Sequence, residues 1–100
     1  MRINFEDDDL KRLYEDADFT APQFGRDLIR AFRKKVAFLE DAASELDLRA
    51  YKALHYEKLV GDRIGQHSIR LNDQWRLILR VEADEAGRIL IIIEIIDYHR

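Results

Sequence analysis

The sequence contains no cysteine, one proline and four glycines in 100 residues. The absence of cysteine excludes disulfide bonds, thiolate chemistry and cysteine metal sites, which suits a reducing cytosol. No apolar run is long enough to cross a membrane, and the first residues lack the apolar segment of a signal peptide. Because 47% of the residues are hydrophobic, the composition is that of a compact chain rather than a disordered one. We therefore expect a globular cytoplasmic protein that does not bind membranes.

The chain also lacks the strong positive charge that is typical of proteins that bind RNA unaided, since its formal net charge is −3. The charges are unevenly distributed. Residues 47–82 carry seven Lys or Arg against five Asp or Glu, whereas the segments on either side are acidic. The positive segment also holds the most distinctive motif of the chain, so we expect substrate contacts there.

Two helices are expected in the first half of the chain. Alternation in residues 2–5 predicts a short strand before them. Acidic residues precede apolar ones at helical spacing, which predicts a first helix near residues 7–15. Thr20 to Gln23 has the pattern of a capping box, so a second helix is expected from about residue 22 to about residue 43. Its apolar stripe would consist of Phe24, Leu28, Phe32, Val36, Leu39 and Ala43.

The second half of the chain has the pattern of a sheet. Residues 44–47 end the helical pattern, and residues 48–66 are irregular. Alternating apolar residues predict strands over residues 67–71 and 75–81, and an almost wholly apolar run predicts another over residues 88–96. A strand that is apolar on both faces is normally central. The expected fold class is α+β, with two N-terminal helices packed on a small, mainly antiparallel twisted sheet.

Two motifs give the chain a family resemblance. Residues 61–76 read GDRIGQHSIRLNDQWR, which is a Gly-Asp-Arg turn, a Ser-Ile-Arg strand, an Asn-Asp-Gln turn and a Trp-Arg pair. Residues 97–99 read Asp-Tyr-His. Together the motifs resemble the signature of HigB-type toxins in the RelE/ParE toxin–antitoxin superfamily, and chain length and element order agree over the full chain.

The resemblance implies a single RelE-like domain over residues 1–100, similar to small microbial ribonucleases. It implies an endoribonuclease that cleaves mRNA on the ribosome, inhibits translation in the cytoplasm and needs no cofactor. It also implies a helix-turn-helix antitoxin of the HigA type as partner, with operator DNA bound only through the toxin–antitoxin complex.

RNA can be cleaved without a metal ion because its own 2′-hydroxyl is the nucleophile. The enzyme then supplies a base, a cation for the phosphate and an acid for the leaving 5′-oxygen. The sequence has no carboxylates clustered at metal-ligand spacing, so the metal-free route is expected.

Arg76 is the candidate for the phosphate-binding cation. A guanidinium is always charged and binds phosphate oxygens through two parallel hydrogen bonds. The resemblance adds that the family's catalytic arginine falls at this position, directly after the aromatic Trp75. From the residues alone, a solvated strand arginine paired with an acid is the alternative.

Asp97, Tyr98 and His99 are the other catalytic candidates, and this set rests on the resemblance. In a continuing strand, Asp97 and His99 would share one face and Tyr98 would point to the other. His99 suits proton transfer near neutral pH, Tyr98 suits stacking on a base, and Asp97 suits orienting His99 or accepting a proton. Which of the three is the base stays open, and a frayed end with a surface histidine is the alternative.

His55, Lys58 and Arg63 are the candidates for substrate binding. Many family members carry a lysine directly before the Gly-Asp-Arg turn, where this chain has Val60. Lys58 would make the phosphate contact instead if the loop is longer, with His55 as a further acid–base candidate. An ordinary surface lysine is the alternative. Arg63 is expected to bind substrate or to hold the turn.

Two other functions stay open at this point. A ParE-like member would poison DNA gyrase by binding and would cleave nothing. A decayed or regulatory homologue would keep only the antitoxin interface. The Asp-Tyr-His motif argues against the first, and Val60 and the acidic balance slightly favour the second.

Overall fold

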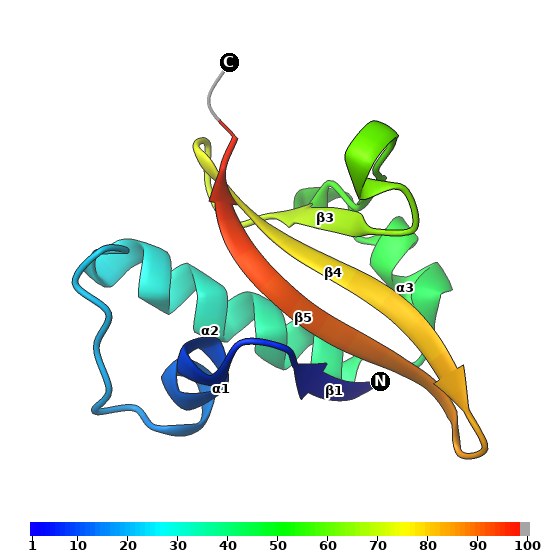
Figure 1. Cartoon of the computed structure of the whole chain (residues 1–100), viewed down its shortest axis with the longest axis horizontal. Coiled ribbons are helices and arrows are strands. Elements are labelled where there is room, and N and C mark those ends of the chain that lie inside the picture. The colour runs from blue at the N-terminus through cyan, green and yellow to red at the C-terminus, as the bar shows by residue number, and fades with distance from the viewer. Residues whose placement is uncertain (99–100) are drawn as a thin grey trace.

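The computed structural model describes residues 1–98, and Figure 1 shows the arrangement of the elements. In chain order they are β1 (Arg2–Phe5), α1 (Asp8–Glu15), α2 (Arg26–Asp41), α3 (Glu45–Ala50), the 3-10 turn η1 (Lys52–Leu54), β2 (Glu57–Lys58), the 3-10 turn η2 (Gly61–Arg63), β3 (His67–Arg70), β4 (Trp75–Asp84) and β5 (Gly87–Asp97). None of the helices in this part of the chain combines the length and the apolar character that a membrane crossing requires.

Within residues 1–98, five strands form one mixed sheet in the order β1-β5-β4-β3-β2. β1 runs parallel to β5, and all other neighbours are antiparallel. The predicted α+β class and the mainly antiparallel sheet are therefore confirmed. The predicted central place of the apolar strand is confirmed as well, because β5 lies between β1 and β4 (Figure 1). Over Ile89–Ile92 it has a paired neighbour on both sides, which protects this apolar run from pairing with other chains.

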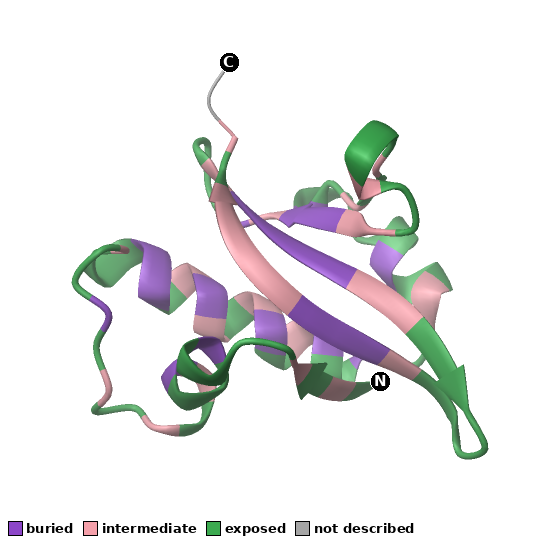
Figure 2. Cartoon of the chain, viewed as in Figure 1, coloured by how far each residue is buried: buried purple, intermediate pink, exposed green. Residues whose placement is uncertain are grey.

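The hydrophobic core lies between α2 and one face of the sheet (Figure 2). The helix supplies Phe32, Val36 and Leu39, which are fully buried. The sheet supplies alternate residues of its two longest strands, as the pleat requires, namely Leu77, Leu79, Leu90 and Ile92. The other face of β4 and β5 therefore carries the residues in between, and Arg76 is one of them.

The predicted start of the second helix is wrong. α2 begins at Arg26, and its N-cap is Gly25 with φ 73° and no side-chain cap, so Thr20 and Gln23 do not form a capping box. A right-handed helix requires a negative φ, so the helix cannot extend from Arg26 towards the N-terminus through Gly25. Glycine adopts this positive φ without strain. Phe24 is therefore outside α2, and its ring packs edge-on against Trp75 with ring centroids 6.1 Å apart.

A third helix was missed. α2 ends at Asp41 with Ala42 as its C-cap, close to the predicted end near residue 43, but residues 44–47 are not an irregular break, because Ser44 is the N-cap residue of α3 and the helix begins at Glu45. The carboxylate of Asp47 accepts a hydrogen bond from the Ala43 backbone N–H at 2.8 Å, which stabilises the turn between the helices. Leu48, on the inner side of α3, is fully buried and extends the core beneath β3 and β4.

The ladder between β4 and β5 contains a β-bulge. Ile78 lies opposite Glu94, whereas the next residue, Leu79, lies opposite Ile92, so Ile93 has no partner of its own. Before the bulge, Ile92 faces the core, and after it Ile95 does. Glu94 is thereby turned to the face that carries Arg76.

Candidate active site

Arg76 is held on the sheet face that points away from α2. It is only 7% exposed, although it is charged. Its Nε donates to the hydroxyl oxygen of Ser68 at 3.0 Å, and its Nη2 donates to the main-chain oxygen of His55 at 2.6 Å. Burial of a charge costs free energy unless hydrogen bonds and ion pairs compensate for it, and these two bonds also fix the position of the guanidinium.

The register of the sheet explains why Ser68 meets Arg76. β3 pairs with β4 so that Ser68 lies opposite Ile78 and Arg70 lies opposite Arg76. Ser68, Arg70 and Arg76 therefore share one face, while Ile69 between them is buried in the core. The Ser-Ile-Arg part of the motif thus contributes one core residue, Ile69, and one residue that contacts Arg76, Ser68.

His55 reaches the same place through an unusual backbone conformation. It ends η1 with φ 48° and ψ 52°, in the left-handed region that few residues other than glycine adopt. This turn brings the His55 carbonyl to Arg76, while the imidazole side chain stays exposed. The backbone of His55 is therefore part of the site, and its side chain lies at the surface beside it.

Glu57 and Tyr98 complete the surroundings of Arg76. The nearest carboxylate oxygen of Glu57 lies 3.8 Å from Arg76 Nη2, and the carboxylate is about half exposed. On the other side, the Tyr98 ring centroid lies 5.1 Å from the guanidinium carbon, within the range of a cation–π contact. We call Arg76, Ser68, His55, Glu57 and Tyr98 the sheet-face site.

Asp97, the last residue of β5, points to the sheet face opposite the one that carries Arg76. It is paired with Trp75, and its carboxylate accepts a hydrogen bond from Gln74 Nε2 at 3.0 Å. The Tyr98 backbone N–H donates to the Gln74 oxygen at 2.6 Å. Gln74 thus holds the end of β5 in place, and Asp97 and Tyr98 point to opposite faces as the sequence predicted. His99 lies outside the described residues.

Arg63 and Lys58 have partners other than Arg76. The guanidinium of Arg63 donates to Gln66 and to Glu94, each at 3.0 Å, and so ties η2 to β5. Lys58 is exposed on β2, where it is paired with His67. The structure therefore brings together Arg76, Tyr98 and the backbone of His55, whereas Asp97 and Arg63 are bound to Gln74 and to Glu94.

A stacked pair supports the segment that carries His55 and Glu57. The rings of Tyr56 and His67 are 4.9 Å apart and almost parallel, at 2°. Burial raises the pKa of Tyr56 to about 12, with the charge of Glu45 acting in the same direction. Burial also lowers the pKa of His67, and the charge of Arg49 adds to this effect while that of Glu45 opposes it. Both rings are therefore neutral at pH 7, and they stack without charge repulsion.

Sequence reasoning missed Glu57 and Ser68. Ser68 stands inside the motif, and its position two residues before Arg70 on an alternating strand was a usable signal. No signal pointed to Glu57, because its strand is two residues long and its approach to Arg76 depends on the turn at His55. Among residues 1–98, no three His, Asp or Glu side chains lie close enough together to hold a metal ion.

Comparison with known proteins gives a family match over nearly the whole chain. Residues 3–99 match a family model described as the RelE-like toxin of type II toxin–antitoxin system HigB. The chain is also 35% identical over 80 residues to Toxin HigB-1 of Vibrio cholerae serotype O1 (strain ATCC 39315 / El Tor Inaba N16961). That alignment covers 80% of this chain and 83% of the relative.

Two solved structures share the fold. The YoeB/ParE toxin from Agrobacterium tumefaciens superposes with a TM-score of 0.60 and 17% identity, over 99% of this chain and 100% of that chain. A chain of the YoeB-YefM complex from Staphylococcus aureus superposes with a TM-score of 0.51 and 17% identity, over 100% of this chain and 98% of that chain. At this identity the likeness concerns the fold alone.

Proposed function

The chain belongs to the HigB-like toxins of type II toxin–antitoxin systems, within the RelE superfamily, and on that premise we propose that it is a ribosome-dependent endoribonuclease. The observation that carries the proposal is the way Arg76 is held. A cation fixed by Ser68 and His55 is preorganised for a phosphate, because it need not be reoriented when charge develops in the transition state.

The donors of Arg76 suit this role. A guanidinium has five N–H donors, of which one on Nε and one on Nη2 are used by the protein. Nη1 makes no hydrogen bond with any residue in the described part of the chain. Its two donors and the second one on Nη2 remain for the non-bridging oxygens of a scissile phosphate.

The proposed reaction uses the RNA's own 2′-hydroxyl. Glu57, which lies next to Arg76, accepts the 2′-hydroxyl proton as the 2′-oxygen forms a bond to phosphorus. The bond from phosphorus to the 5′-oxygen breaks, and His99 donates a proton to that oxygen. The products are a 2′,3′-cyclic phosphate and a free 5′-hydroxyl. Tyr98 moves from Arg76 onto a base, and Asp97 keeps the end of β5 in position.

The supporting residues have separate roles in this proposal. His55 holds Arg76 through its carbonyl, and Arg63 fixes η2 beside the mRNA path. Lys58 offers an exposed ammonium next to Glu57 for a neighbouring phosphate. In this proposal the ribosome positions the mRNA, which compensates for the low positive charge of the chain. Because ribosomes translate in the cytoplasm, the proposed place of action is the cytoplasm. A HigA-like helix-turn-helix antitoxin is the proposed inhibitor, and it carries the complex to operator DNA.

The test is to map transcript 5′ ends after the protein is induced without antitoxin. We expect new ends inside translated frames for the wild type, and none for Arg76→Ala or in a reporter without a start codon. Arg80→Ala is the matched control, because Arg80 lies on the same strand and is held by ion pairs to Glu6 and Glu82 near the surface. It should cleave like the wild type.

Other outcomes would point to other functions. Growth arrest without new ends would contradict the nuclease proposal and favour a gyrase poison of the ParE kind. A well-expressed protein that gives neither arrest nor new ends would be a regulatory or decayed homologue.

A further inference from the structure

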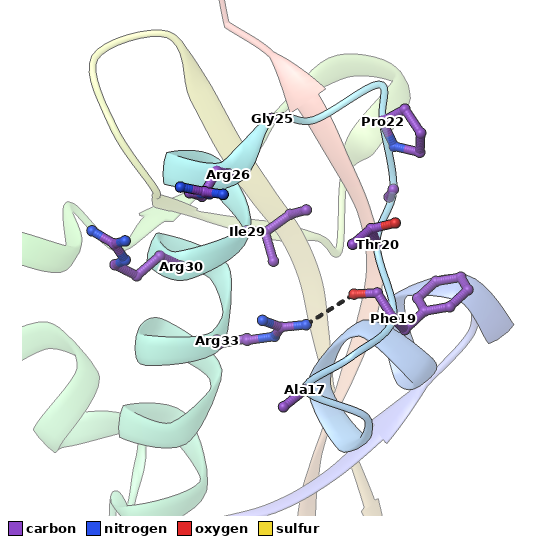
Figure 3. A pocket seen from close by; sticks show the side chains of 10 residues that line it. Ala17, Phe19, Thr20, Pro22, Gly25, Arg26, Ile29, Arg30 and Arg33 are labelled. Atoms are coloured by element: carbon purple, nitrogen blue, oxygen red, sulfur yellow. Dashed lines mark hydrogen bonds between the residues drawn. The ribbon is translucent and has the colours of Figure 1, made fainter.

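A groove lies between α2 and the loop that leads into it (Figure 3). Its volume is about 480 Å³, and its apolar lining includes Phe19 and Pro22 from the loop and Ile29 from α2. Arg26, Arg30 and Arg33 line it as well, and none of the described residues that line it is acidic. The groove thus joins an apolar floor to a positively charged rim.

Hydrogen bonds hold the groove in shape. Arg33 Nε donates to the Leu13 oxygen at 2.7 Å, at the end of α1. Its Nη2 donates to the Phe19 oxygen at 3.1 Å and to the Asp16 oxygen at 3.3 Å (Figure 3 shows the bond to Phe19). One side chain of α2 therefore binds the last turn of α1 once and the chain after it twice, so the groove exists before any partner binds.

Arg26 and Arg30 are left without acidic partners. They are four residues apart, on the same side of α2, and both are exposed. Neither makes an ion pair or hydrogen bond with the described part of the chain, not even with the adjacent Asp27. Other exposed arginines do have such partners: Arg2 pairs with Asp84, and Arg88 pairs with Glu45. The groove therefore presents two free guanidinium groups beside an apolar hollow.

We infer that this groove binds an acidic peptide segment of the antitoxin, with one apolar side chain in the hollow and carboxylates on Arg26 and Arg30. The inference rests on the proposed function, which makes the antitoxin the partner. A guanidinium binds a carboxylate through two parallel hydrogen bonds. An apolar side chain buried in a pocket is often the centre of a protein–peptide interface. An RNA backbone would use the arginines but would leave the apolar lining unused, so the lining favours a peptide.

The position of the groove has a functional consequence. α2 packs on the sheet face opposite Arg76, so a segment bound in the groove does not cover the guanidinium of Arg76. Antitoxin affinity and cleavage activity should then respond to different substitutions.

The test measures the affinity of the purified cognate antitoxin for toxin variants by isothermal titration calorimetry. The double variant Arg26→Glu/Arg30→Glu should bind about 100-fold more weakly. Lys11→Glu/Lys34→Glu changes the net charge equally at exposed lysines outside the groove, and it should lose less than about threefold. Thr20→Trp fills the hollow without a change of charge and should weaken binding about 10-fold. Melting temperatures check that each variant is folded.

Three results would overturn the inference. The first is unchanged antitoxin affinity in Arg26→Glu/Arg30→Glu, and the second is an equal loss of affinity in both double variants. The third is unchanged antitoxin affinity but lost ribosome binding in Arg26→Glu/Arg30→Glu, which would assign the two arginines to RNA. If the wild-type chain binds no antitoxin at all, the proposed partner itself is wrong and the inference is wrong with it. The Arg76→Ala variant separates the two proposals, since it should lose cleavage and keep the antitoxin affinity of the wild type.

Discussion

The sheet-face site and the groove beside α2 share one structural feature. In each, an arginine side chain donates hydrogen bonds to main-chain oxygens of a neighbouring segment. Arg76 holds the turn at His55, and Arg33 holds the loop at Phe19. The two regions differ in what lies next to that arginine. Beside Arg76 there are a carboxylate and an aromatic ring, whereas beside Arg33 there are an apolar hollow and two unpaired arginines. The first set suits proton transfer on a phosphate, and the second suits binding.

The largest expected effect comes from Glu57→Gln, which should separate the two regions completely. The amide keeps the shape of the carboxylate but accepts no proton, so cleavage of ribosome-bound mRNA should slow by about 100-fold. Antitoxin affinity should stay the same, because the groove is untouched. Glu82→Gln is the control, since Glu82 lies on β4 and pairs with Arg80 rather than with a residue of the sheet-face site. Cleavage by Glu57→Gln at the wild-type rate would remove Glu57 from the mechanism.

A smaller effect is expected from Arg33→Met, which should damage the groove and leave the sheet-face site intact. The variant loses the hydrogen bonds to Leu13 and Phe19, so the free energy of unfolding should fall by about 2 kcal/mol in urea titrations. Antitoxin affinity should fall with it, while the cleavage rate stays the same. Lys34→Met, at the exposed neighbouring position, is the control. Equal stability of the two variants would show that Arg33 does not anchor the loop.

The smallest effect is a pH dependence of stability that arises at the stacked pair of Tyr56 and His67, which supports the segment of the sheet-face site. Burial lowers the pKa of His67 in the folded state, so the unfolded chain binds more protons as the pH falls below the ordinary histidine value of about 6.5. Stability should therefore be lower at pH 5 than at pH 7, with His67 contributing less than about 1 kcal/mol. Thermal melts of His67→Phe should show a smaller fall of the melting temperature between pH 7 and pH 5 than those of the wild type. If the melting temperature falls equally between pH 7 and pH 5 in His67→Phe and in the wild type, the pH dependence does not come from His67.

Local pattern was enough to predict the strands and the core face. The alternation in β4 and the apolar run in β5 are patterns among neighbouring residues. Both predicted strands are present in the sheet. The predicted start of α2 was wrong because the capping-box pattern at Thr20 was outweighed by the positive φ of Gly25. α3 was missed because it is only six residues long and begins three residues after the C-cap of α2, so that Ser44 to Asp47 has the pattern of a helix end.

The site was predictable only as far as its motifs reach. Arg76 and Tyr98 stand inside recognisable motifs, and the structure places them in contact. Glu57 approaches Arg76 just after the left-handed turn at His55, and Tyr56 between them stacks on His67. Such a contact between a short strand and a distant one leaves no pattern in the sequence.

The bulge at Ile93 makes the number of residues in β5 matter more than their identity. Leu90, Ile92 and Tyr98 are separated by even numbers of positions, so in a regular strand Tyr98 would face α2 together with the core leucine. The unpaired Ile93 reverses the alternation once, and this turns Tyr98 towards Arg76. The strand thus tolerates exchanges among its apolar residues, whereas the loss or gain of one residue between Ile92 and Tyr98 would exchange the faces of everything that follows. In this protein the alternation of faces along β5, and not only its composition, therefore decides that Tyr98 lies against Arg76.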